Sequence, residues 1–435
     1  MMRYIPVTDR DRQEMLKRCK ADSVEHLFSC IPEQVRLKRP LNLPPAKSEM
    51  ELIKYMQSLA AQNSNTGNYA CFLGAGAYDH YIPSVISHLI SRQEFLTAYT
   101  PYQPEISQGT LTAIFEYQTM ICELTGMDVA NASMYDGASA LAEACAISSG
   151  AFRKRSDIII VEDMHPEYRE TVETYLKFRD IKYTSMTVKQ LLEADLTNVA
   201  GVCVQYPSFY GDIYDMQVIG DYVKQNGSLF IVCANPVALA LLKSPKDFGA
   251  DFVVGEGQPL GMPMGFGGPY LGFFACVKEH MRKMPGRIVG KTTDVDGKTA
   301  YVLTLQAREQ HIRREKATSN ICSNQALCAL TATIYLSVTG KKGFKQVAQR
   351  CVDNAHYVYE GLLKTGKFEK TSDMPFFHEF TVKPKVNIAA LNRYLYGHGF
   401  IGGLETDRGW LIAVTEKRTK EEMDEFIRRA GEFNG

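Results

Sequence analysis

The middle of the chain alternates short apolar segments with helix-like segments, and this alternation constrains the fold more than any other feature. Patterns typical of buried strands occur at Ile158–Val161, Val199–Gln205, Leu229–Cys233, Phe252–Val254 and Leu271–Cys276, with a shorter strand near Lys182–Thr184. Between the strands, the pattern predicts helices that end near Phe178, span Met216–Gln225 and, more briefly, span Pro236–Leu242. Strands that alternate with helices build a mainly parallel sheet with both faces covered. We therefore expect an α/β fold.

Polar residues follow several of these strands directly. They are His165, Tyr206-Pro207, Asn235 and Gln258. Ligands in parallel sheets sit beyond the carboxyl ends of the strands. We expect these residues to cluster at one edge of the sheet.

The segment Gly249–Cys276 holds a short strand, a glycine-rich turn and a second apolar strand. In pyridoxal-phosphate enzymes of the aspartate-aminotransferase type, such a segment carries the lysine that forms the Schiff base with the cofactor. Here no lysine lies between Asp247 and Val277, and Gln258 stands in the turn. Two interpretations follow: a cofactor site that has lost its lysine, or a plain glycine-rich loop.

A small-residue turn enters a helix at Asp136–Ser139, shortly after Ser133. Free backbone N–H groups at a helix start favour an anion, so a phosphate could dock there, against Asp136–Ser139. The alternative is ordinary N-capping with close helix packing, and the charge of Asp136 would repel a phosphate.

Residues 71–110 combine glycines with many tyrosines and prolines. The Gly74-Ala-Gly76 sequence lacks the third glycine of a dinucleotide-binding loop, and no βαβ unit frames it, so nucleotide binding is disfavoured. The tyrosines predict an ordered aromatic loop. That loop either forms an interface or lines a substrate site.

Bulk composition excludes several classes of function. Of 435 residues, 45% are hydrophobic and 23% charged, with 49 basic and 49 acidic residues, so no net field favours nucleic acid or an acidic membrane. The nine histidines and eleven cysteines lack H-E-x-x-H and C-x-x-C spacing, so no metal site is expected and the thiols indicate a reduced, cytoplasmic protein. Neither a G-x-S-x-G elbow nor a Walker A motif occurs. We see neither a signal peptide nor a run long enough to span a bilayer.

The flanks of the alternating region suggest three domains, at residues 1–65, 66–335 and 336–435. The first is an N-terminal arm with helices over Arg10–Cys19 and from Glu49 to Ala61, and such an arm packs across a neighbour in the same chain or in a partner. The last is a smaller C-terminal α/β domain, reached through a long helix from Gln325 whose pattern changes beyond Gly340.

Residues 284–325 form a polar insertion before this domain. Asp294–Gly297 predicts a hairpin turn. His311–Lys316 is a basic run, either a solvated face or a contact for a phosphate or carboxylate partner.

Several long strings in this sequence resemble the glycine cleavage system P-protein family, the decarboxylating glycine dehydrogenases. The resemblance spans essentially the whole chain and is with the first (N-terminal, alpha) subunit of the enzymes that are split into two. It is carried by Phe72–His80 (FLGAGAYDH), Thr97–Gly109 (TAYTPYQPEISQG), Ala132–Gly137, Gly265–Pro269, Pro285–Gly290 and Gln310–Cys322 (QHIRREKATSNIC). It implies an aspartate-aminotransferase-like fold (fold type I of pyridoxal-phosphate enzymes) with a seven-stranded, mainly parallel sheet. It also implies pyridoxal-phosphate-dependent decarboxylation of glycine, with transfer of the aminomethyl group to the lipoyl arm of H-protein.

The resemblance further implies that the second subunit carries the lysine and the cofactor, in an α2β2 assembly. We expect no working cofactor site in this chain, because Gln258 replaces the lysine and Asn235 offers no carboxylate to a pyridinium nitrogen. The degenerate site would comprise Ser133, Asp136, Gly137, Ala138, His165, Asn235 and Gln258. Residues lent to the partner's active site would be Tyr99, Tyr102, Gln103 and Glu105. The rival hypotheses are a complete enzyme that uses a distant lysine such as Lys243 or Lys246, and a purely regulatory or scaffold subunit.

Overall fold

The computed structural model describes residues 6–435 and divides the chain into two units, which meet at Ser64 and Asn65. In the N-terminal unit, α1 (Asp9–Arg18), η1 (Glu25–Phe28) and α2 (Glu49–Ala60) are joined by irregular chain. Thr8 and Ser48 begin the two α-helices with capping boxes, so each N-terminus is satisfied by its own side chains. None of residues 6–64 is buried.

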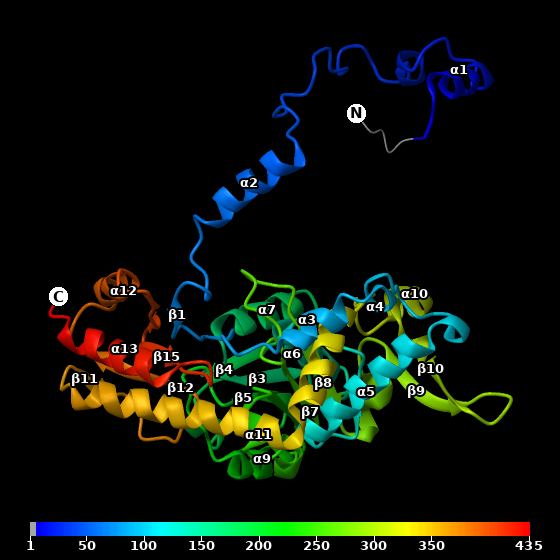
Figure 1. Ribbon diagram of the computed structural model, residues 1–435. Helices are drawn as coiled ribbons and strands as arrows, with labels where there is room; N and C mark the ends of the chain where they lie inside the picture. Colours follow the sequence, from blue (N-terminus) through cyan, green and yellow to red (C-terminus); the bar gives the residue numbers. More distant parts are fainter. Residues whose placement is uncertain (1–5) are drawn as a thin grey trace. The chain divides into compact units, whose positions relative to one another are not determined.

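The second unit is built on a seven-stranded sheet with the order β2-β8-β7-β6-β5-β3-β4 (Figure 1). Its strands are β2 (Val129–Ala130), β3 (Asp157–Val161), β4 (Tyr183–Met186), β5 (Val199–Tyr206), β6 (Leu229–Ala234), β7 (Phe252–Glu256) and β8 (Gly272–Cys276). Strands β3 to β7 run parallel, and β8 pairs antiparallel with both β7 and β2. The predicted mainly parallel sheet is confirmed.

Helices cover both faces of this sheet, because successive strand side chains point to opposite sides. On one face α6 (Gly137–Ser149) and α7 (Pro166–Lys177) pack on residues such as Ile231 and Cys233. On the other face α5 (Gln108–Thr125), α9 (Met216–Gln225) and the first half of α11 pack on residues such as Phe230 and Val232. Each face therefore has its own apolar core.

Shorter elements connect these layers. They are α3 (Ser84–Ile90), α4 (Gln93–Leu96), η2 (Pro104–Ile106), α8 (Val188–Leu191), η3 (Ala238–Ala240), η4 (Pro245–Phe248), η5 (Lys278–Lys283), η6 (Gln306–Arg308), α10 (Gln310–Arg313) and η7 (Arg314–Lys316). The predicted hairpin is present, as β9 (Ile288–Thr293) paired with β10 (Thr299–Thr304). The helix predicted over Pro236–Leu242 is wrong in extent: only a 3-10 turn forms there, and the chain soon reaches Pro245, whose ring disfavours helical geometry at the preceding residue.

A smaller C-terminal lobe contains a four-stranded antiparallel sheet in the order β11-β12-β15-β14. Its elements are β11 (Phe368–Lys370), β12 (Glu379–Pro384), α12 (Ile388–Tyr396), β13 (Phe400–Ile401), β14 (Leu404–Thr406), β15 (Gly409–Ala413) and α13 (Lys420–Glu432). Its core includes the fully buried Trp410 and Phe426, and extends to Phe72, beside β1 (Ala70–Cys71). Because β1 pairs with β13, the chain passes through this lobe before it enters the large sheet.

Helix α11 (Ala326–Lys364) runs from the large sheet into the C-terminal lobe and is kinked at Gly340, whose φ of 58° and ψ of 174° are not helical. Few residues other than glycine adopt these angles. The change of pattern predicted beyond Gly340 therefore marks a kink between two helical halves that follow each other directly.

Polar contacts join the C-terminal lobe to the large sheet. The Glu379 carboxylate accepts hydrogen bonds from the Ala75 N–H (2.6 Å) and the Tyr78 hydroxyl (2.7 Å). Arg408 forms an ion pair with Asp163 and lies 3.5 Å from a carboxylate oxygen of Asp212. The segment around Ala75 and Tyr78 is thus held between the two sheets.

Across residues 6–435, no helix combines the length and the apolar character that a membrane crossing requires. The division of the second unit into domains 66–335 and 336–435 stays a prediction.

Candidate functional site: a small cavity at the strand ends

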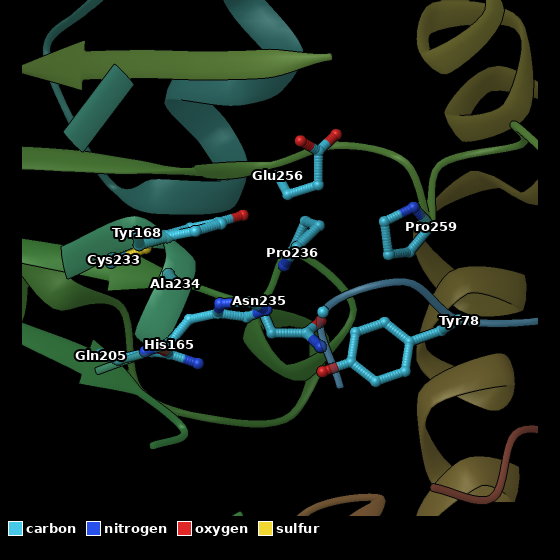
Figure 2. Close-up of a pocket in the computed structure, with 11 residues that line it drawn as sticks. Tyr78, His165, Tyr168, Gln205, Cys233, Ala234, Asn235, Pro236, Glu256 and Pro259 are labelled. Atoms are coloured by element: carbon cyan, nitrogen blue, oxygen red, sulfur yellow. The ribbon is translucent and has the colours of Figure 1, made fainter. Parts of the chain in front are cut away.

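A small cavity lies where the parallel strands end (Figure 2). It is lined by Gly76, Tyr78, His165, Tyr168, Gln205, Cys233, Ala234, Asn235, Pro236, Glu256 and Pro259. Gln205, Ala234 and Glu256 are at the carboxyl ends of β5, β6 and β7, as the rule for parallel sheets predicts. The cavity volume is about 40 Å³. A water needs roughly 10–15 Å³ on this measure, so the space holds only a few waters.

Glu256 lines one side of this cavity, and its carboxylate is held by backbone N–H groups. One oxygen accepts the N–H groups of Gln258 (3.0 Å) and Leu271 (2.9 Å), and the other accepts the Gly137 N–H (3.0 Å) at the start of α6. Burial raises the pKa of Glu256 to about 7, with a smaller upward effect from Asp136, while the three N–H donors act in the opposite direction. The group therefore titrates near neutral pH.

Gln258 is fully buried, and its amide is bonded to backbone. Its oxygen accepts the Tyr78 N–H (2.9 Å), and its nitrogen donates to the carbonyls of Tyr78 (3.0 Å) and Met262 (2.8 Å). The side chain fastens the glycine-rich turn to the segment at Tyr78. Gln258 is not among the cavity-lining residues, whereas Pro259 is.

His165 caps α7 and holds a defined neutral tautomer. Its Nδ1 accepts the Glu167 N–H (3.2 Å), so the Nε2–H donates to the Ala75 carbonyl (3.1 Å). Burial lowers the pKa of His165, which keeps the ring neutral at pH 7. The ring stacks on Tyr168 with a centroid separation of 4.8 Å.

The Asn235 side chain is also hydrogen-bonded to neighbouring backbone. Its Oδ1 accepts the N–H groups of Val237 (2.9 Å) and Ala238 (3.3 Å). The only carboxylate among the described residues that line the cavity is Glu256, on the next strand, and it points away from Asn235 (Figure 2).

The predicted residues at the start of α6 act in helix capping. Asp136 accepts the Ser139 N–H (2.7 Å) in a capping box, and half-buried Ala138 follows in the first turn. Ser133 faces elsewhere, since its hydroxyl accepts the Gln325 N–H (3.1 Å). The capping alternative therefore describes this turn, and Gly137 is the residue of the turn that reaches the cavity edge, through its bond to Glu256.

The aromatic loop predicted to serve a partner lies at the surface, away from the cavity. Tyr99 is 87% exposed and Tyr102 is 49% exposed, and Gln103 and Glu105 are exposed as well. The Tyr102 ring lies against the buried Arg287, which donates to its hydroxyl (3.1 Å). The loop borders an apolar hollow of about 180 Å³ between Phe95 and the start of α11.

Both distant lysines lie outside the cavity lining. Lys246 pairs with Asp128, and exposed Lys243 lies over the Phe248 ring at 5.4 Å. The basic residues Arg313, Arg314 and Lys316 are exposed.

Three polar residues of the cavity were not among the predicted site residues: Tyr168, Gln205 and Glu256. Only Glu256 carried a usable signal, as a lone carboxylate between two glycines (Gly255 and Gly257) at the end of a buried strand. Tyr168 reaches the cavity through contacts between segments distant in sequence, which periodicity does not reveal. Tyr78 belongs to the predicted tyrosine-rich segment, and it is the tyrosine of that segment that lines this cavity.

These residues do not fit pyridoxal phosphate. The lining contains no lysine among the described residues, the Gly137 N–H is bonded to Glu256, and Asn235 faces backbone. Sites for small organic ligands measure roughly 300–1,000 Å³, well above the volume present here.

Comparison with known proteins agrees with the resemblance seen in the sequence, for both the family and the fold. The family model for the glycine cleavage system P-protein matches residues 2–429. Proteins described as probable glycine dehydrogenase (decarboxylating) subunit 1 are 51% identical in Desulforamulus reducens and 50% identical in Anoxybacillus flavithermus, each over 99% of both chains.

Among solved structures, the inhibitor-bound glycine decarboxylase (P-protein) of the glycine cleavage system has a TM-score of 0.92 at 41% identity, covering 99% of this chain and 100% of that chain. Glutamate decarboxylase of Lactobacillus brevis, at 14% identity and a TM-score of 0.69 over 92% of this chain and 95% of that chain, shares the fold alone. The predicted fold type I architecture is confirmed. The match over nearly every residue and the half-identical relatives lead to one conclusion: the chain belongs to the glycine cleavage system P-protein family.

Proposed function

We propose that this chain is the non-catalytic first subunit of a two-subunit glycine dehydrogenase (decarboxylating). A lysine-bearing second subunit binds pyridoxal phosphate, and the two chains assemble as α2β2. The complex decarboxylates glycine and passes the aminomethyl group to the lipoyl arm of H-protein. The isolated chain is inactive.

The observation that carries this proposal is the combination of full-length similarity with a small cavity that no lysine lines. Relatives described as subunit 1 align with 99% of the chain. Yet the cavity at the strand ends lacks room and a lysine among the residues that line it. A chain that keeps the fold without a cofactor site supports a role beside a catalytic partner.

The exposed aromatic loop is the part of the chain that we assign to the partner's active site. Tyr99, Tyr102, Gln103 and Glu105 present hydroxyl, amide and carboxylate groups at the surface, and Arg287 holds the Tyr102 ring in place. These side chains would bind and orient substrate at the shared site. Pyridoxal phosphate, where it is bound, supplies the electron sink for decarboxylation.

Reconstitution tests the proposal. The chain, the candidate second subunit and the mixture are each assayed for glycine–bicarbonate exchange with lipoylated H-protein and added pyridoxal phosphate. We expect exchange only in the mixture, and native mass spectrometry should give two copies of each chain. Activity of this chain alone, with a borohydride-trapped cofactor on Lys243, Lys246 or another lysine, would establish the complete-enzyme alternative.

The substitutions Tyr102→Phe and Glu105→Gln in the loop distinguish a shared active site from a pure scaffold role. Arg313, Arg314 and Lys316 have a separate test. Charge reversal there should weaken H-protein affinity or assembly if the run binds an acidic partner, and change neither if it is a solvated face.

A further inference from the structure

We propose that Glu256 is a built-in occupant of the anion position at the start of α6, and that its carboxylate excludes external anions from this cavity. The inference rests on the proposed function, in which the cofactor belongs to the partner, and it names the residue that closes the site in this chain. The missing lysine removes the covalent link to a cofactor. Glu256 acts at a different place, the start of α6, where an anion would otherwise bind.

The contacts of the Glu256 carboxylate are those of a bound anion. Three backbone N–H groups from three separate segments converge on it within 3.0 Å: Gly137 from α6, Gln258 from the turn, and Leu271 at the entry to β8. Convergent N–H groups that include a helix start are the usual donors to a phosphate or carboxylate. Here the acceptor is supplied by the chain.

Tyr168 and strand β7 pack closely against Gly137 at the start of α6. A Cβ on Gly137 would lie 2.5 Å from the Tyr168 hydroxyl oxygen and 2.9 Å from the Glu256 backbone nitrogen. Strand β7 therefore approaches the start of α6 so closely that only glycine fits. The Ser139 N–H, also in the first turn of α6, already donates to the Asp136 carboxylate.

The same three contacts make Glu256 a cross-link. The carboxylate ties the end of β7 to the start of β8 and to α6, so both ends of the glycine-rich turn are anchored on one side chain. Tyr168 and Pro259 flank it in the cavity lining (Figure 2). Removal of the carboxylate should free the Gly137 N–H and enlarge the cavity at that end.

The test uses the full-length chain and inorganic phosphate as the probe. Wild type, Glu256→Ala and Glu256→Gln are titrated with phosphate by calorimetry at pH 8, where the carboxylate is ionised. Wild type should not bind, whereas Glu256→Ala should bind with a dissociation constant of about 1 mM or tighter. Glu143→Gln, a buried carboxyl on the same helix outside the cavity, is the matched control and should behave as wild type.

Glu256→Gln keeps the side-chain volume and gives a second readout. An amide has one acceptor oxygen, so either the Gly137 N–H or the pair from Gln258 and Leu271 loses its acceptor. Hydrogen exchange at one of these amides should accelerate by about tenfold or more. Phosphate should stay excluded from this variant, because the amide fills the same space.

Three results would overturn the inference: phosphate binding by wild type as tight as by Glu256→Ala, no phosphate binding by a folded Glu256→Ala, or unchanged exchange in Glu256→Gln. If Glu256→Ala does not fold, the exchange measurement decides. A separate titration of wild type with pyridoxal phosphate tests the proposed function. Specific binding there would overturn both ideas, whereas failure of Glu256→Ala to gain phosphate would leave the proposed function intact.

Discussion

Glu256 and Glu379 are carboxyl groups enclosed near the cavity, and burial raises the pKa of each to about 7. Their hydrogen bonds differ: Glu256 accepts only backbone N–H groups, and Glu379 accepts the Tyr78 hydroxyl and the Ala75 N–H. At the residue scale, the protonation of these two groups links stability to pH.

Replacement of Glu256 by Gln should change the pH dependence of unfolding. The unfolded carboxyl has its ordinary pKa near 4.5 and the folded one about 7, so the native state holds the proton more tightly in between. Wild type therefore loses stability relative to Glu256→Gln as pH rises from about 4.5 to 7, by up to about 3 kcal/mol. Urea unfolding of both proteins at pH 5 and pH 8 measures this. A wild-type–variant difference that is the same at both pH values would show that Glu256 does not titrate in this range.

Tyr102→Phe and Glu105→Gln test whether the aromatic loop serves the partner's active site. Each removes one polar group from an exposed side chain, and Arg287, which loses the Tyr102 hydroxyl as an acceptor, still donates to the Cys322 carbonyl, so the fold should be retained. In the reconstituted complex, we expect each to slow glycine–bicarbonate exchange by about tenfold or more, the usual effect of losing a positioned polar group. Tyr357→Phe, which loses an exposed hydroxyl bonded to Asp424, and Glu193→Gln are matched controls. Equal exchange rates in all four variants would show that the loop does not contribute to the partner's active site.

At the element scale, the kink in α11 depends on Gly340. A Cβ there would meet no atom within 4 Å, so any cost of substitution comes from the backbone conformation alone. Gly340→Ala should lower the free energy of unfolding by about 1–3 kcal/mol.

Gly343 provides the control for this prediction, three residues further along the same helix. It has ordinary helical geometry, and a Cβ there would make a normal contact with Thr339 at 3.7 Å. Gly343→Ala should therefore raise stability by about 0.5–1 kcal/mol. Chemical denaturation measures the free energy of unfolding of both variants. If Gly340→Ala and Gly343→Ala changed it in the same direction, the kink would not depend on Gly340.

The elements show what a sequence can and cannot predict. The apolar runs at Val199–Gln205 and Leu229–Cys233 predicted β5 and β6 to within a residue, because a strand buried on both faces leaves a continuous apolar signal. Strand β2 was missed, since two residues carry no periodicity. In the site, His165 and Asn235 followed from the strand-end rule. The position of Glu256 at the end of β7 agrees with the same rule, but its contacts could not be predicted, because they involve N–H groups from segments more than a hundred residues apart.

On the scale of the whole molecule, the two units differ in how they are stabilised. Every residue of the apolar cores belongs to the second unit, among the residues that the structure describes. The N-terminal unit exposes large apolar side chains, including Val35 (73%), Leu43 (70%) and Met50 (78%). Exposed apolar surface of this kind predicts an interaction segment.

Deletion of residues 1–64 should leave the remaining fold intact and impair assembly. We expect residues 65–435 to unfold cooperatively at a temperature within a few degrees of the full chain, because no described core residue is removed. The truncated chain should form less heterotetramer with the second subunit, as light scattering would measure. If the truncated chain assembles normally, the arm makes its contacts within its own chain. If residues 65–435 no longer unfold cooperatively, the second unit is not independent of the arm.

The polar contacts that hold the C-terminal lobe to the large sheet have a mechanical consequence. Moving the lobe away would separate Glu379 from Ala75 and Tyr78, and Arg408 from Asp163, and would leave several charged or polar groups without partners. Motion of that kind is costly, so the C-terminal lobe and the large sheet should move together as one rigid body.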